Sequence, residues 1–144
     1  SSFAYGEALN AEGKIIDKKI VGKMSRDGWQ FTREIELFRK SFVINDYFSG
    51  DAEVEWFFAL SPFLTPQKSE PGLLILKEIG SLKLVRLEIS EPLTAEILPG
   101  YVSWQYNKAY PSQRIYLKSK VKGEKRLRFS FEMLGKDLSQ GQYR

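Results

Sequence analysis

At 144 residues, the sequence is long enough for one domain to bury a core without disulfides or metal ions. It contains no histidine and no cysteine, which excludes the usual zinc and copper sites, Ser-His and Cys-His nucleophile pairs, and histidine acid-base chemistry within this chain. A net charge of +4, from 22 basic and 18 acidic residues, is too small to indicate nucleic-acid binding.

No stretch approaches the about 18 apolar residues of a membrane helix, and the N-terminus has no basic region followed by an apolar core. We therefore expect a soluble chain without a membrane span. The sequence begins at Ser1 rather than at a methionine, which is consistent with a fragment or a processed chain. We expect one domain over residues 1–134, followed by a polar tail over residues 135–144.

Turn signals divide the first part of the chain. Residues 10–13 (NAEG) predict a turn, and the Ile/Val-rich residues 14–24 favour short strands over a weak helix. Asp27-Gly28 predicts a hairpin turn. Residues 33–60 then contain three alternating runs separated by turn formers, which predict an antiparallel three-stranded meander.

The first strand of this meander carries a charge on its apolar face. Arg33 shares that face with Phe31 and Ile35 by alternation. Because an unpaired buried charge is costly, we expect a carboxylate partner on the neighbouring strand. Asp46 is the candidate, and we interpret Arg33 and Asp46 as a structural ion pair rather than a catalytic one.

Proline residues recur through the second half of the chain and limit where strands can form. Residues 61–72 (SPFLTPQKSEPG) hold three prolines and predict a loop that cannot continue a sheet. Short strands are predicted over residues 73–78, 82–89 and 93–98, with a turn at Pro99-Gly100. Residues 126–134 alternate strictly, with Leu127, Phe129, Phe131 and Met133 on the apolar face. About ten strands and no helix predict an all-β, antiparallel, supersandwich-like β-sandwich.

Two groups of side chains are candidate binding residues. The first is an aromatic and basic group that could contact sugar, although packing is the more common role of strand aromatics: Trp104, Tyr106, Tyr110 and Arg114. The second is a late basic cluster that favours a solvated hairpin, with a patch for an acidic polymer as the alternative: Lys118, Lys120, Lys122, Lys125, Arg126 and Arg128. We expect no metal ion and no cofactor.

Several weak motifs in order resemble one family. TREIEL around Arg33, SFVINDYFSG around Asp46, EWFFALSPFL and the segment 100–121 (GYVSWQYNKAYPSQRIYLKSKV) are similar to the C-terminal β-domain of heparinase II/III-type proteins. The resemblance covers residues 19–134. Phe57 or Phe58 stands where this family often has a histidine.

The resemblance implies a parent protein that cleaves acidic polysaccharide by β-elimination, in the periplasm or outside the cell. In that family the catalytic groups come mainly from an N-terminal α-helical toroid and a His-Asn segment, and this sequence contains neither. We therefore expect a non-catalytic domain that supports the missing toroid or helps to bind acidic polysaccharide, without nucleic acid. A free-standing carbohydrate-binding module and a structural or interaction domain without ligand are the alternatives.

Overall fold

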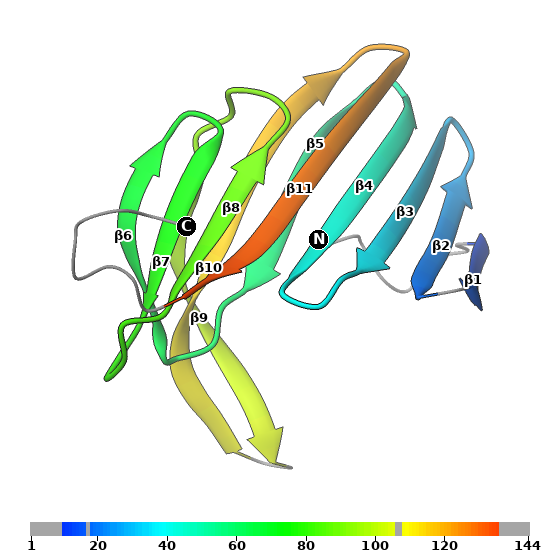
Figure 1. Ribbon diagram of the computed structural model, residues 1–144. Helices are drawn as coiled ribbons and strands as arrows, with labels where there is room; N and C mark the ends of the chain where they lie inside the picture. The colour runs from blue at the N-terminus through cyan, green and yellow to red at the C-terminus, as the bar shows by residue number, and fades with distance from the viewer. Residues whose placement is uncertain (1–9, 17, 106–107, 136–144) are drawn as a thin grey trace.

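The structure is a computed structural model that describes residues 10–16, 18–105 and 108–135. These residues form strands and connecting turns, without a helix, so none of them forms a helix that could cross a membrane. The eleven strands are shown in Figure 1. They are β1 (Asn10–Ile16), β2 (Lys19–Arg26), β3 (Trp29–Leu37), β4 (Ser41–Gly50), β5 (Ala52–Ala59), β6 (Leu64–Glu70), β7 (Leu73–Glu78), β8 (Leu84–Ile89), β9 (Glu96–Gln105), β10 (Lys108–Val121) and β11 (Glu124–Leu134).

The strands build two antiparallel sheets of unequal width. The large sheet has eight strands in the order β1-β2-β3-β4-β11-β8-β7-β6, and the small sheet has three in the order β5-β10-β9. The small sheet lies behind part of the large one in Figure 1. The predicted all-β antiparallel sandwich is confirmed, with eleven strands in the described residues where the sequence predicts about ten.

The predicted meander is correct for β3 and β4 but wrong for β5. β3 pairs with β4, with Arg33 opposite Asp46, whereas β5 pairs with β10 in the small sheet. The chain therefore crosses between layers at the predicted hairpin turn. Gly50, with φ of 138°, makes this possible, because a Cβ there would lie 2.6 Å from the carbonyl oxygen of Gly28.

A second crossing, from β10 to β11, lies beside the first. The amide of Gly50 donates to the carbonyl of Gly123 at 2.7 Å, and the amide of Gly123 donates to Oδ1 of Asp51 at 2.8 Å. Consequently β4 and β11 pair in one sheet while β5 and β10 pair in the other.

The core lies between the sheets. Leu127, Phe129 and Phe131 of β11 point inward and are buried, while Arg126 and Arg128 are exposed on the outer face. Aromatic side chains from β5 pack on this strand, with the Trp56 and Phe129 ring centroids 6.2 Å apart. Met133, which the alternation places on the apolar face, is 54% exposed because that face is open here, in a hollow also lined by Phe42 and Phe131.

Three turn and loop predictions are wrong. Residues 10–13 begin β1 instead of forming a turn, and residues 61–72 contain β6. Pro66 is tolerated there because β6 is an outer strand with one neighbour, and the pairing register shifts between Pro66 and Lys68. Pro99-Gly100 lies inside β9, which is likewise the outer strand of its sheet.

Candidate functional site

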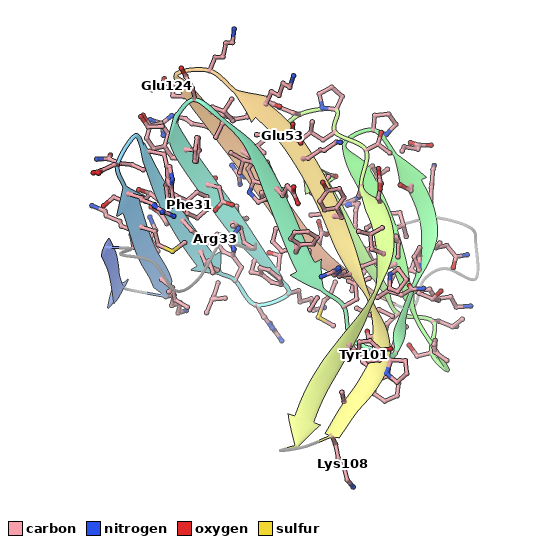
Figure 2. All side chains as sticks on the ribbon, turned by 180° about the vertical axis from the view of Figure 1, so that it is seen from behind. Phe31, Arg33, Glu53, Tyr101, Lys108 and Glu124 are labelled. Atoms are coloured by element: carbon pink, nitrogen blue, oxygen red, sulfur yellow. The ribbon has the colours of Figure 1, made fainter. Side chains whose placement is uncertain are left out.

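The structure brings Arg33 and Asp46 together inside the sandwich. Arg33 donates from Nε to Oδ1 of Asp46 at 2.8 Å and from Nη2 to Oδ2 at 2.6 Å. The guanidinium also lies 5.6 Å from the ring centroids of Phe31 and Phe58. Figure 2 shows Arg33 on the side of the large sheet that faces the small one.

Trp56 adds a third donor to this pair. Its Nε1 donates to Oδ2 of Asp46 at 3.0 Å, from β5 in the opposite sheet. Asp46 is 3% exposed, and its two oxygens accept three hydrogen bonds from protein groups. The arrangement leaves this carboxylate closed to a substrate and ties three strands together. The alternation of Trp56 with polar residues indicates its burial, but the bond across the layers depends on the crossing at Gly50 and has no local signal in the sequence.

The predicted sugar-contacting residues lie along the β9–β10 hairpin, whose far half projects from the body of the sandwich (Figure 1). Trp104 is in β9 and Tyr110 is in β10, opposite Val102, but their side chains lie outside the described part of the structure. Tyr106 lies outside the described residues altogether. Arg114 is therefore the one member of this group whose side chain can be placed.

Arg114 lies on the outer face of the small sheet and stacks on an aromatic pair. Its guanidinium carbon is 4.8 Å from the ring centroid of Phe57, and the Phe57 and Tyr116 centroids are 4.9 Å apart. A Cβ at Gly100 would lie 3.5 Å from Cγ and Cδ of Arg114, an ordinary van der Waals distance, so the arginine stem packs over Gly100 of the neighbouring strand. Arg114 is exposed and has no ion pair with any described residue. Its donors are thus held in one place and remain available to an anion.

Phe57 and Tyr116 are absent from the sequence-based site. The signal that could have found them is Phe57 itself, an aromatic residue on the polar face of β5 with Glu53 and Glu55. Desolvation raises the pKa of the Tyr116 phenol above its ordinary value, and the nearby carboxylate of Glu55 raises it further. The phenol stays protonated at neutral pH and can donate a hydrogen bond beside Arg114.

Tyr101 in β9 is 74% exposed, and Figure 2 shows it where the hairpin leaves the body of the sandwich. By the pairing register it lies on the opposite face of the hairpin from Arg114. Lys108 marks the far end of the same hairpin in that view. The exposed aromatic and basic groups therefore share one hairpin but are divided between its two faces.

The late basic cluster is divided by the fold. Lys118 and Lys120 lie on β10, opposite Glu55 and Glu53. Arg126 and Arg128 lie on β11 in the other sheet, while Lys125 is paired with Glu91 at 2.9 Å. The six residues do not form one patch. Within the described ranges, no three carboxylates gather as a potential metal site.

Comparison with known proteins gives a match in structure. No family model matches the chain, and no curated protein sequence does. A heparinase III gene product superimposes with a TM-score of 0.65 at 18% identity, covering 85% of this chain and 21% of that chain. Heparan sulfate lyase from Pedobacter heparinus gives a TM-score of 0.67 at 12% identity, covering 87% of this chain and 21% of that chain.

A second heparinase III structure gives a TM-score of 0.66 at 9% identity and covers 92% of this chain and 22% of its own. The 4-alpha-glucanotransferase from Thermococcus litoralis gives 0.65 at 12% identity, covering 89% of this chain and 24% of that enzyme. At these identities the likeness shows the fold alone. The predicted resemblance is confirmed at that level, and the chain spans about a fifth of the length of the matched heparinase chains.

Proposed function

We propose that this chain is the β-sandwich domain of a longer polysaccharide lyase related to heparinase III, and that it helps to bind an acidic polysaccharide without cleaving it. The observation that carries the proposal is the fold match, in which 85% of this chain corresponds to 21% of a heparinase III chain. The absence of histidine from the sequence supports an auxiliary role, because histidine is a common proton carrier in enzymes.

Arg114 supports the glycan contact. A guanidinium that is fixed over Phe57 and lacks a carboxylate partner among the described residues can form paired hydrogen bonds with a uronate or sulfate group. The Tyr116 phenol lies on the same face of β10 as Arg114 and can donate a hydrogen bond to a neighbouring sugar hydroxyl.

The outer edge of β5 supports a place in a longer protein. Leu60 N–H donates to the carbonyl of Gln113, so alternate residues from Leu60 backwards direct their amides toward β10. The amides of Glu53, Glu55 and Ala59 consequently point to the other edge, which no described strand covers. A long strand edge without proline or lysine is a template for further strands, and the remainder of a longer protein would supply them.

Titration tests the binding role. We expect the 144-residue chain to bind heparan sulfate oligosaccharides more tightly than neutral dextran oligosaccharides. Arg114→Gln should weaken that binding about tenfold, since a hydrogen-bonded charge pair contributes about 1.5–3 kcal/mol. Lys83→Gln, which removes an exposed cation from the β7–β8 connection of the other sheet, is the matched control and should leave affinity unchanged. Equal binding of acidic and neutral sugars, or none, would reject the glycan role.

Product analysis tests the auxiliary role. Incubation of the purified chain with heparan sulfate should release no unsaturated sugars, whereas their release would show that elimination occurs within this domain. The complete reading frame separates the proposal from its main alternative. An upstream α-helical toroid with a His-Asn segment supports the lyase domain, and a frame without one favours a free-standing carbohydrate-binding module that uses the same Arg114 face.

A further inference from the structure

A polar groove crosses the outer face of the large sheet, on the side away from the small sheet. It has a volume of about 500 Å³ and is lined by side chains of β3, β4 and β11 and by Ser90 after β8. Of these strands, β11 passes in front of the small sheet in Figure 1. The groove is thus separated from Arg114 by the thickness of the sandwich.

Two arginines of β11 line this groove and lack a carboxylate partner. Arg126 and Arg128 occupy alternate positions, so both side chains lie on the outer face, where both are exposed. Neither forms an ion pair within the described residues, whereas two other basic side chains on this face do. Lys19 pairs with Glu34, and Arg86 pairs with Glu132. The two unpaired guanidinium groups are therefore a distinct feature of this face.

Neighbouring groups hold the side chain of Arg126 and the backbone of Arg128 in place. The guanidinium carbon of Arg126 lies 4.4 Å from the ring centroid of Tyr47, whose hydroxyl donates to Oε2 of Glu124 at 2.9 Å. The backbone of Arg128 exchanges hydrogen bonds with Ser90: its N–H donates to the serine hydroxyl, and its carbonyl accepts from the Ser90 amide, both at 2.9 Å. Because the Arg126 guanidinium already lies against Tyr47, ligand binding costs less side-chain conformational entropy.

The groove also offers a neutral hydrogen-bonding group. Asn45 lies directly opposite Arg128, and its half-buried side chain has no hydrogen bond to any described residue. An amide supplies two donors and one acceptor oxygen, which suits vicinal sugar hydroxyls. The groove thus combines anion-binding groups with a group that binds hydroxyls.

We propose that this groove is a second glycan site, in which Arg126 and Arg128 bind carboxylate or sulfate groups of an acidic oligosaccharide and Asn45 binds its hydroxyls. The proposal takes its ligand class from the proposed function but concerns a separate surface. Alternate strand residues are about 7 Å apart, so the two guanidinium groups can engage anions on one or two adjacent sugars. Glu34 lines the same groove and disfavours the dense phosphate charge of a nucleic acid.

Calorimetric titration of the chain with a heparan sulfate oligosaccharide, an unsulfated uronate oligosaccharide and single-stranded DNA of matched length tests the site. The Arg126→Gln, Arg128→Gln double variant should bind the acidic sugars about tenfold or more weakly than the unsubstituted chain. Arg39→Gln with Lys40→Gln removes the same charge from the β3–β4 turn and should change affinity less than about twofold. If the β11 double variant loses affinity for both sugars, the site binds the carboxylate groups. If it loses affinity for the sulfated sugar alone, the site binds sulfate groups.

Two further measurements separate this site from the Arg114 face and from a folding defect. Asn45→Ala should weaken sugar binding with an unchanged melting temperature, and the side-chain amide resonances of Asn45 should shift when sugar binds. If Arg114→Gln abolishes binding while the β11 double variant binds normally, the second site is rejected and the proposed function stands. The second site is also rejected if the Arg39→Gln, Lys40→Gln control loses as much affinity as the β11 double variant, or if the chain binds DNA more tightly than sugar.

Discussion

The indole of Trp56 donates a hydrogen bond to the carboxylate of Asp46 across the two sheets, at 3.0 Å. The oxygen that accepts it, Oδ2, also accepts from Nη2 of Arg33. A single buried carboxylate therefore fixes the position of β3 and β5 relative to β4. No buried polar side-chain atom in the described residues lacks a hydrogen-bond partner. Because Arg33 and Trp56 both donate to this acceptor, the network stabilises one arrangement of the layers over others.

Asp46→Ala should destabilise the protein by about 3–5 kcal/mol, because it leaves a guanidinium and an indole in the core without their acceptor. Urea denaturation of the variant measures the change in the free energy of unfolding. A loss of under about 1 kcal/mol would mean that the pair behaves like an exposed surface ion pair.

Trp56→Phe should cost about 1.5–3 kcal/mol, the usual contribution of a hydrogen bond to a charged group, with some loss of packing in addition. A double-mutant cycle with Asp46→Asn isolates the bond from the packing. We expect a coupling energy of about 0.5–3 kcal/mol between the two positions. Strictly additive effects would contradict a direct interaction.

Gly50→Ala should be far more harmful than Gly123→Ala, although both glycines lie where the chain changes sheets. A Cβ at Gly50 would meet the Gly28 carbonyl oxygen at 2.6 Å and Cβ of Trp29 at 2.9 Å, while a Cβ at Gly123 would have nothing within 4 Å. We expect a loss of about 3 kcal/mol or more at Gly50 and about 1–2 kcal/mol at Gly123, where positive φ alone is the cause. Similar melting temperatures for the two variants would refute this explanation of the crossing.

Amide hydrogen exchange along β5 should alternate. The amides of Trp56 and Phe58, which face β10, should exchange slowly, and those of Glu53 and Glu55 should exchange quickly. NMR on the 144-residue chain measures each amide separately. If the chain is part of a longer protein, as proposed, added strands would slow the Glu53 and Glu55 amides as well. Uniform protection in the isolated chain would show that the edge is already covered.

Tyr116 should ionise at higher pH than an unperturbed tyrosine, because desolvation and then Glu55 raise the pKa of its phenol. The folded protein holds this proton more tightly than the unfolded chain does. Its contribution to stability is thus present below the ordinary tyrosine pKa and is lost as pH rises through the folded-state pKa. Absorbance titration against a Tyr116→Phe reference follows the phenolate, and Glu55→Gln should lower the pKa toward its ordinary value.

The success and the failure of sequence-based prediction have separate physical origins. The alternation of Leu127, Phe129 and Phe131 is set by which face of one strand is buried, and a local pattern records it. The proximity of Arg33 and Asp46 follows from a tight hairpin, which fixes the register of neighbouring strands. Both features can be predicted from the sequence because they depend on short segments.

The sequence does not predict the partner strand of β5, because Ser49-Gly50-Asp51 is compatible with both a hairpin turn and a crossing between sheets. The outcome depends on β11, which begins only at Glu124 and takes the place beside β4 that a meander would give to β5. Pro66 and Pro99 were misinterpreted for a related reason. Proline excludes a central strand but not an outer one, and the position of a strand in its sheet is not encoded locally.

The last strand of the described chain occupies the middle of the large sheet, between β4 and β8. Until residues 124–134 leave the ribosome, β1 to β4 and β6 to β8 are two separate half-sheets with no hydrogen-bonded strand to join them. Completion of the sandwich must therefore follow synthesis of its final segment. A premature stop before Glu124 would release a polypeptide with two unsatisfied inner strands, a substrate for chaperones and proteases rather than a shortened working domain.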